Sequence, residues 1–493
     1  MKIKSLNIKL IYLLIFLIAA FLRVYNIEQK NLWFDEVFSW HISEGSVRQI
    51  VAETSGDIHP PFYYIVLKYW ISVFNDSVFS MRMLSVIFGL AAMIFIYRLS
   101  ERIFSNSFIT AGVLLLYSLS PLNIYYSQEV RMLNLNLFLC LGSVYYFYKA
   151  TDKSGLKNGM MYFAFTVLAL YTHYFSLLIL FTELLITFLF YFSGKRNIRD
   201  LKIFFIYAAA VNIFYAPWYP VFFSQSVKGQ PWRTEQTLAQ SGMNVIEYFK
   251  DVFLSSYYAF ENSGIIYFAD LTGILIAGFI LFSLAFILIR RKKIISETDY
   301  LHLFFMVPFM IAVLISLKQS ILLSRYLSII IPYLFFLLLS FSFFLFSKKI
   351  SYALLVLLIL ASCIGIYAGN NNNFKNNDYR RIISYIEENF KKGDQIIAEP
   401  HFMGWVINYY INHNKTELTP PKILGWNLEM QLDSIRQKKD LNRIWFISDY
   451  SSLDKRNYDS LPNLMTDLGY YCQSKKSFYI IPSKVRVDHY IKD

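Results

Sequence analysis

Two adjacent carboxylates, Asp35 and Glu36, follow the first apolar segment of the chain. Aromatic residues surround them: Trp33, Phe34, Phe38 and Trp40. Apolar surroundings raise the pKa of a carboxylate or demand a cationic partner for it, and such surroundings suit a base that takes a proton from a hydroxyl group. The alternative is that these are loop carboxylates at an interface and are merely solvated. Their position and surroundings favour a functional role.

A second candidate group is Gln128, Glu129 and Arg131, crowded into the stretch SQEVR at the outer end of an expected helix. An ordinary polar cap between helices is the alternative. Arg131 could pair with either carboxylate of the first group or bind an anionic leaving group, because guanidinium forms paired hydrogen bonds with such oxyanions. Glu129 could ligate a metal, but one acid is weak support for a metal site.

Two arginines, Arg82 and Arg325, begin apolar segments at their outer ends, against the usual bias of basic residues towards the cytoplasm. Snorkelling to lipid headgroups could explain both. Phosphate binding is favoured for Arg325, because Lys318 lies on the same short loop. Tyr326 follows Arg325 and joins the same candidate set. His59, fixed before two prolines, is well placed to line a site.

Other classes of site are not indicated. No Walker-type loop, zincin motif or serine nucleophile elbow occurs. The chain has three cysteines, and none has the spacing of metal ligands or of a disulfide framework. The expected cytoplasmic loops are too short to build a nucleotide-binding domain. If the protein is a transferase, its donor should therefore come from the membrane.

The composition is that of a polytopic membrane protein, since 56% of the 493 residues are hydrophobic and only 16% are charged. Eleven spans are predicted, at residues 9–25, 79–97, 108–122, 133–149, 159–172, 175–192, 203–217, 265–289, 299–317, 326–346 and 350–368. With a cytoplasmic N-terminus, all six inner segments are basic, as the positive-inside rule requires. The C-terminus is then extracytoplasmic.

The largest outer loop is predicted at residues 26–78. Its apolar stretch 62–74 is short for a span and contains Lys68. Counting this stretch as a span would also place later loops on the wrong face, so we predict a helix along the membrane surface. Residues 218–264 are predicted as a further long outer loop.

The tail differs in composition from the rest of the chain. We predict a transmembrane domain at residues 1–368, a polar linker at 369–377 and a small extracytoplasmic α/β domain at 378–493. An amphipathic helix is expected at the start of this domain, ending near Gly393. The runs IWFIS and SFYIIP are expected to be strands.

Five motifs along the chain resemble those of the polyprenyl-phosphate-sugar-dependent glycosyltransferases of the GT-C fold, which include relatives of protein O-mannosyltransferase and of lipid A aminoarabinose transferase. They are W-x-D-E-x-x-S from Trp33, H-P-P-x-Y-Y from His59, R-x-x-S-x-x-x-G from Arg82, S-P-x-x-x-Y-S-Q-E-x-R from Ser120, and R-Y-L-x-x-x-x-P from Arg325. The start of the tail, D-Y-R-R-I-I-S-Y-I, is also similar to many bacterial members. The resemblance covers nearly the whole chain and specifies no substrate.

The resemblance implies an all-α, GT-C-like membrane domain and transfer of a monosaccharide, with inversion, from a polyprenyl-phosphate donor to a hydroxyl acceptor. The acceptor, a protein, lipid or glycan, would be met on the outer face of the cytoplasmic membrane. Asp35 matches the family's base, Glu36 would assist it, and Arg131 would hold a carboxylate or the phosphate. The departing phosphate needs cationic stabilisation rather than a general acid. No metal is inferred, although a divalent ion is possible.

A transporter or flippase for lipid-linked sugars is the main alternative, and a sugar-lipid binding protein is another. A transporter would call for charged residues at mid-membrane depth and for inverted repeats. The predicted spans carry almost no charge at their centres, with Glu183 as the exception, and the chain shows no internal repeat. Both features favour the transferase.

Overall fold

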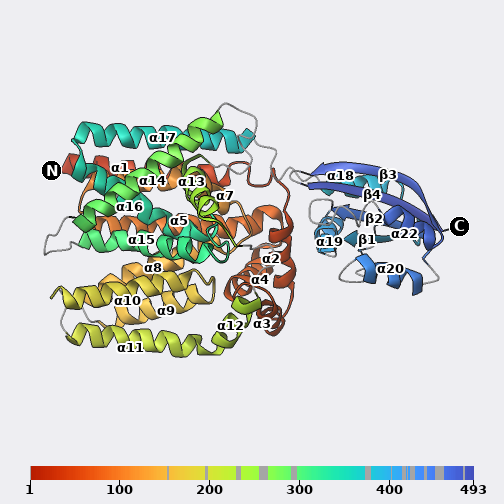
Figure 1. Ribbon diagram of the computed structural model, residues 1–493, viewed down its shortest axis with the longest axis horizontal. Coiled ribbons are helices and arrows are strands. Elements are labelled where there is room, and N and C mark those ends of the chain that lie inside the picture. The colour runs from red at the N-terminus through yellow and green to blue at the C-terminus, as the bar shows by residue number, and fades with distance from the viewer. Residues whose placement is uncertain are drawn as a thin grey trace. The chain divides into compact units, whose positions relative to one another are not determined.

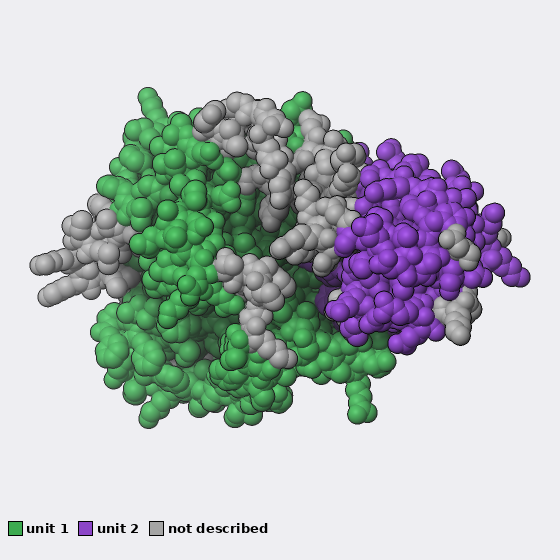
Figure 2. Space-filling view, turned by 45° about the vertical axis from the view of Figure 1, so that its right-hand side comes forward, with its two compact units in different colours: residues 1–25, 45–372 green, residues 26–44, 373–493 purple. Residues whose placement is uncertain are grey.

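The structure of the protein is a computed structural model. It describes residues 2–152, 155–194, 198–228, 235–254, 265–289, 297–371, 379–400, 402–413, 418, 420–421, 428–437, 441–449, 460–480 and 483–492. The chain forms two compact units, coloured separately in Figure 2. Unit 1 comprises residues 1–25 and 45–372, and unit 2 comprises residues 26–44 and 373–493.

Unit 1 is helical, and its long helices lie side by side (Figure 1). Its elements up to the middle of the chain are α1 (Lys2–Val24), α3 (Val47–Gly56), α4 (Phe62–Phe74), α5 (Val78–Ile103), α6 (Ser107–Leu119), α7 (Pro121–Ser127), α8 (Leu133–Asp152), α9 (Leu156–Leu170), α10 (Ser176–Phe192) and α11 (Ile198–Tyr215). They are followed by η1 (Ala216–Trp218), α12 (Tyr219–Lys228), α13 (Leu238–Leu254), α14 (Ile265–Ile289), α15 (Glu297–Ser316), η2 (Tyr326–Ile330), α16 (Ile331–Leu345) and α17 (Lys348–Asn371).

Helices α8 and α16 form the centre of unit 1, because side chains along both are buried almost throughout. Helix α8 packs against α5, α9 and η2, and α16 packs against α6, α15 and α17. By contrast, α1 and α17 expose apolar side chains such as Leu17 and Leu357, at 52% and 60%. Apolar surface of this kind is favourable against hydrocarbon and unfavourable against water. The outer helices therefore have the surface of a membrane protein.

A helix lies at each of the eleven predicted spans, but these helices differ in length and composition. Within the described residues, six candidates are long and apolar enough to cross a membrane: Asn7–Val24, Val78–Ile103, Leu201–Val227, Thr298–Ser316, Tyr326–Leu345 and Lys348–Gly369. The pair α6 and α7, bent by 58°, is a further candidate. Helices α9 and α10 have 15 and 17 residues, fewer than the roughly 20 of an ordinary span. The chain is a multi-pass membrane protein, and the count of eleven stays a prediction.

Two segments that were predicted as outer loops contain helices. The stretch predicted as a surface helix is α4, which occupies Phe62–Phe74. Its 13 residues extend about 20 Å, too short to cross the roughly 30 Å of hydrocarbon. The predicted loop 218–264 contains α12 and α13. Thr237 and Gln240 form reciprocal hydrogen bonds at the start of α13, the arrangement of a capping box.

Unit 2 contains a four-stranded sheet. Its elements are α2 (Phe34–Glu44), α18 (Tyr379–Glu387), β1 (Gln395–Glu399), α19 (Met403–His413), α20 (Leu428–Gln437), β2 (Arg443–Asp449), α22 (Leu461–Asp467), β3 (Tyr470–Ile480) and β4 (Ser483–Lys492). The strand order is β1-β2-β4-β3. Strands β1 and β2 are parallel, and the other two pairs are antiparallel. Of the predicted linker, residues from 372 onward lie outside the described ranges.

Helices cover both faces of this sheet. On one face, Leu432 of α20 and Met465 of α22 pack into a core with Phe446 of β2. On the other face, Tyr385 of α18 meets the ring of Trp445 edge-on, with ring centroids 6.0 Å apart. Side chains of a strand alternate between its two faces, so Phe446 and Trp445 reach opposite layers. Helix α19 also packs against β1 and β2.

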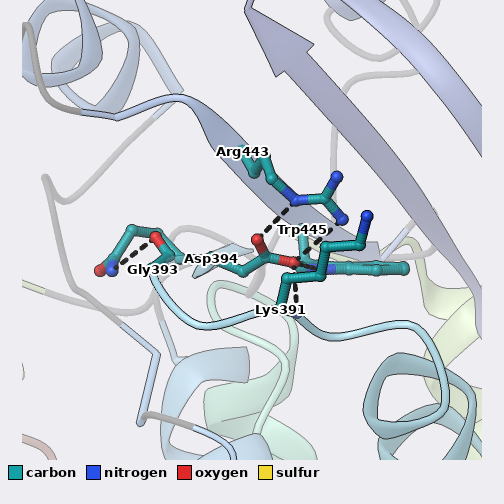
Figure 3. Close-up of polar contacts among 6 residues, drawn as sticks. Lys391, Gly393, Asp394, Arg443 and Trp445 are labelled. Atoms are coloured by element: carbon teal, nitrogen blue, oxygen red, sulfur yellow. Dashed lines mark hydrogen bonds and ion pairs between the residues drawn. The ribbon is translucent and has the colours of Figure 1, made fainter.

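Asp394, at the turn before β1, fixes that turn to β2 (Figure 3). Its buried carboxylate accepts hydrogen bonds from Arg443 Nε at 2.6 Å, from Trp445 Nε1 at 2.8 Å and from the backbone N–H of Lys391 at 3.1 Å. Burial alone would raise the pKa of Asp394, but the Arg443 and Trp445 hydrogen bonds lower that pKa below its usual value. The carboxylate is therefore ionised and holds the two parallel strands in register.

Candidate active site

Asp35 and Glu36 occupy the first turn of α2 in unit 2. Asp35 is half-buried and Glu36 is fully buried. Glu36 Oε2 accepts a hydrogen bond from the backbone N–H of Trp33 at 3.3 Å, which satisfies a donor just before the helix. The first turn of a helix is also where its dipole stabilises negative charge. Glu36 therefore helps to define the start of α2, while Asp35 keeps part of its surface accessible.

Two of the sequence motifs meet in unit 1, where α5 contacts the loop between α7 and α8. Ser85 Oγ donates a hydrogen bond to the Glu129 carbonyl at 2.6 Å. Asn134 Nδ2 donates to the Ser85 carbonyl at 3.0 Å and to Ser127 Oγ at 2.8 Å. A methyl group on Gly89 would lie 2.8 Å from Asn134 Nδ2. A side chain larger than glycine at this position would therefore have to displace Asn134, where α5 approaches α8.

The charged residues of these motifs are buried beside that contact. Arg82 lies on α5 one turn before Ser85 and is 2% exposed. Glu129 and Arg131 are 2% and 9% exposed. Buried charges are costly unless they are paired or hydrogen-bonded, so their placement at one end of α5 indicates a polar site within the apolar unit.

Gln128 lies at the end of α1. Its Nε2 donates to the Tyr25 carbonyl at 2.8 Å and to the Arg23 carbonyl at 3.1 Å. The last carbonyls of a helix have no partner within the helix, so Gln128 supplies one. Gln128 therefore anchors the end of α1, and its contact with substrate stays a prediction.

An aromatic cluster joins His59 to the Arg325–Tyr326 pair. The rings of His59 and His173 lie 5.4 Å apart between centroids, and those of His173 and Tyr326 lie 5.5 Å apart. Phe175 stacks on Tyr326 at 5.2 Å. The guanidinium carbon of Arg325 is 5.0 Å from the centroid of the Tyr326 ring, within the range of a cation–π contact. Residues from three distant stretches of unit 1 thus form one cluster.

The loop before Arg325 is tied to α13 by Asp251, whose carboxylate accepts a hydrogen bond from Ser324 Oγ. Asp251 is 6% exposed. Lys318, predicted to act with Arg325, lies just after α15 and is exposed. Asp251, which the sequence analysis did not single out, therefore helps to fix the residue that precedes Arg325.

A second contact that the sequence did not predict joins α3, α12 and the bend between α9 and α10. Gln225 of α12 donates from Nε2 to the Thr54 carbonyl at 2.9 Å, and it accepts a hydrogen bond from Tyr174 OH. Trp218 Nε1 donates to Tyr174 OH at 3.0 Å. Burial raises the pKa of Tyr174 to about 12, so this hydroxyl remains protonated and keeps donating at neutral pH. The contact links α3, α12 and the bend between α9 and α10.

Within the described ranges, no three or more His, Cys, Asp or Glu side chains are grouped so that they could hold a metal ion. The candidate residues fall into separate groups. Unit 2 carries the carboxylates of α2, and unit 1 carries a buried polar group at the end of α5 and an aromatic cluster that includes Arg325.

The chain is similar to several known proteins. Residues 58–219 match the family model of dolichyl-phosphate-mannose-protein mannosyltransferase. One similar solved structure is ArnT from Cupriavidus metallidurans bound to undecaprenyl phosphate. Its sequence is 11% identical, the match covers 96% of this chain and 97% of that chain, and the TM-score is 0.51. Its apo structure is 10% identical, with 98% of each chain covered and a TM-score of 0.53.

An oligosaccharyltransferase from Archaeoglobus fulgidus is 14% identical, covering 91% of this chain and 69% of that chain, with a TM-score of 0.53. No curated protein sequence matches the chain. At these identities, the structural matches establish the fold. The resemblance inferred from the motifs is thereby confirmed: the chain has the GT-C fold of the polyprenyl-phosphate-sugar glycosyltransferases.

Proposed function

We propose that the protein is an inverting glycosyltransferase. It moves a monosaccharide from a polyprenyl-phosphate donor to a hydroxyl group of a protein, lipid or glycan on the outer face of the cytoplasmic membrane. One observation carries the proposal. The motifs around His59, Ser85 and Glu129 form polar and aromatic clusters within residues 58–219, the part of the chain that matches a mannosyltransferase family.

The donor is assigned to unit 1. ArnT, which shares the fold, has been crystallised with undecaprenyl phosphate, and a lipid phosphate of this kind needs cationic groups. Arg131 and Arg325 are proposed to bind the phosphate, with Lys318 assisting from the same loop as Arg325. Arg82 and Glu129 complete the polar site at the end of α5. His59 and Tyr326 hold Arg325 through the aromatic cluster.

Asp35 is proposed to act as the base. It takes the proton of the acceptor hydroxyl, whose oxygen attacks C1 of the sugar on the face opposite the phosphate. The bond from C1 to the phosphate oxygen breaks, and the polyprenyl phosphate leaves with the electron pair, so the anomeric configuration inverts. Positive charge develops on the sugar and negative charge on the phosphate, and preorganised cationic groups stabilise the latter. Glu36 orients Asp35 by defining the start of α2.

Transport of a lipid-linked sugar is less well supported. Glu183 is the charged residue that the sequence places at mid-membrane depth, and it is fully buried. Its carboxylate accepts hydrogen bonds from Ser143 Oγ at 2.7 Å and from Tyr162 OH at 2.9 Å. These bonds between α8, α9 and α10 suit a structural role inside the bundle.

The test is transfer by the purified chain in liposomes. Undecaprenyl phosphate carrying radiolabelled mannose is supplied first and other monosaccharides in parallel, with cell-envelope extract as the source of acceptors. Label on an acceptor, with equimolar release of undecaprenyl phosphate, supports the proposal. Passage of intact donor across the bilayer would instead identify a transporter, and retention of donor without transfer or transport would identify a binding protein.

A further inference from the structure

Helix α2 packs with the C-terminal part of the chain. Residues 26–44 form unit 2 together with residues 373–493, whereas the residues on either side of this segment belong to unit 1. Helix α2 has 11 residues, and a helix of this length is marginal without tertiary packing. Its stability and the placement of its side chains must therefore depend on what it packs against.

The main partner of α2 is α19, through aromatic contacts along one side. Phe34 lies 4.3 Å from Phe402 between ring centroids, and Phe38 lies 5.7 Å from Trp405. His41 stacks on Trp405 at 4.7 Å with an interplanar angle of 21°. Residues 34, 38 and 41 share one face of a helix, so Phe402 and Trp405 cover that face along its length.

Two further contacts hold α2 near its C-terminal end and the residues just before its start. Trp40 meets Tyr409 edge-on at 5.1 Å. Before the helix, the backbone N–H of Leu32 donates to Tyr410 OH at 2.7 Å. Leu32 is fully buried, so this hydroxyl satisfies a donor that water does not reach. Helix α2 is thus fixed along its side and at its entry.

Helix α19 is itself anchored in the sheet domain. Val406 and Ile407 on α19 are fully buried, and α19 packs against β1 and β2. Helix α19 therefore connects α2 to the sheet of unit 2. Asp35 follows Phe34 directly, so its backbone position is defined by the same contacts.

We propose that α19 positions Asp35 for transfer, with Trp405 and Tyr410 as positioning residues contributed by the C-terminal domain. The inference rests on the proposed function of Asp35, and it assigns the C-terminal domain a part in the reaction. A displacement of about 1 Å in a reacting group can cost about a hundredfold in rate. Loss of the α19 contacts should therefore lower turnover without removing the base itself.

The test compares Trp405→Ala with Tyr385→Ala in the full chain. Both remove a half-buried aromatic ring from unit 2, but Tyr385 contacts Trp445 and Phe478 rather than α2. We expect Trp405→Ala to lower kcat at least tenfold, while the KM for undecaprenyl-phosphate-mannose changes less than threefold. Trp405→Phe should restore most of the rate, and Tyr385→Ala should keep it.

Hydrogen–deuterium exchange provides a readout that is independent of the donor sugar. Trp405→Ala should speed amide exchange in residues 34–44 and leave α5 and α8 unchanged. If Trp405→Ala does not fold, Tyr410→Phe, which removes only the hydroxyl, should speed exchange at residues 32–36 and lower kcat. Unchanged exchange in residues 32–44 in these variants would overturn the inference, as would equal kcat for Trp405→Ala and Tyr385→Ala. Full activity of Asp35→Asn would instead overturn the assignment of the base, because the exchange result does not depend on it.

Discussion

The hydroxyl of Ser85 donates a 2.6 Å hydrogen bond to the carbonyl of Glu129, and this bond joins α5 to the loop before α8. Asn134 donates back to the carbonyl of Ser85. The two bonds bring together motifs that lie more than forty residues apart in the chain. The positions of Glu129 and Arg131 therefore depend on how closely α5 and α8 approach.

Gly89→Ala should disturb this approach. The added methyl group would lie 2.8 Å from Asn134 Nδ2 and 3.0 Å from Ser127 Oγ, so the Asn134 side chain must shift. Overpacking of this kind costs about 1–3 kcal/mol. We expect a lower Tm in detergent and a transfer rate reduced severalfold.

Gly278→Ala is the matched control for Gly89→Ala. Gly278 also lies within a long helix, and a methyl group there meets nothing within 4 Å. Alanine is favoured over glycine inside a helix by about 1 kcal/mol. The control should therefore keep or raise the Tm and keep the rate. Equal effects of the two variants would contradict the role of the contact between α5 and α8.

Arg325→Ala should weaken donor binding. The guanidinium group lies over the ring of Tyr326 and is proposed to bind the lipid phosphate. We expect the Kd for undecaprenyl phosphate to rise about tenfold, equivalent to about 1.4 kcal/mol. The KM for the acceptor should change little. Arg98→Ala is the control, because Arg98 is an exposed arginine near the C-terminal end of α5. This variant should bind undecaprenyl phosphate with an unchanged Kd. Equal losses of donor and acceptor binding would indicate that Arg325 is only structural.

Glu399→Gln should change how the stability of unit 2 depends on pH. Burial raises the pKa of Glu399 from 4.5 to about 7, so the folded state holds this proton more tightly than the unfolded state. The contribution of Glu399 to the free energy of unfolding is therefore complete below about pH 4.5 and is lost as the pH rises to about 7. The loss amounts to as much as about 3 kcal/mol.

Glutamine resembles the protonated acid and can still accept the hydrogen bond from Gln431 Nε2. Differential scanning fluorimetry of both proteins between pH 4.5 and pH 8 should show the variant gaining in Tm relative to the native chain as pH rises. A constant difference in Tm would show that Glu399 is ionised in the folded state across this range.

Local patterns allowed several elements to be predicted from the sequence. Helix α4 occupies the 62–74 stretch, and β2 includes the run IWFIS. Strand β3 includes the first four residues of SFYIIP, and the last two lie outside the described residues. These elements have a hydrophobic period that is visible within the segment itself. Strand β4 was missed because SKVRVDHYIK mixes charges with its apolar residues. Its buried Arg486 and Asp488 form an ion pair at 2.7 Å, a pairing that local sequence does not reveal.

Hydropathy alone does not determine which helices span the membrane. Helix α8 is buried on nearly all sides, so the polar side chains of Asn134 and Asn136 are kept away from lipid. A hydropathy criterion counts composition and does not distinguish burial in protein from contact with lipid.

The candidate site was proposed from the sequence as a set of motifs, and its role in transfer stays a prediction. Arg82, Glu129, Arg131 and Arg325 were singled out from residue type and position, but the contacts around them could not be predicted. Asp251 and Gln225 support the site through contacts with residues far away in sequence, to Ser324 and Thr54. The packing of α2 on α19 joins residues more than 360 positions apart, as in the bond from Leu32 to Tyr410. Such pairings follow from the fold and have no local signature.

The central claim is that Asp35 is the base for glycosyl transfer, and Asp35→Asn tests it most directly. The variant keeps the size of the side chain and removes its ability to accept a proton, and a general base contributes about 10²- to 10⁴-fold to a rate. Glu44→Gln, at the exposed end of the same helix, is the matched control. Transfer from undecaprenyl-phosphate-linked sugar in liposomes should fall at least about a hundredfold for Asp35→Asn, with Tm and undecaprenyl phosphate binding unchanged, and should persist for Glu44→Gln. A rate for Asp35→Asn within threefold of the native chain would contradict the account.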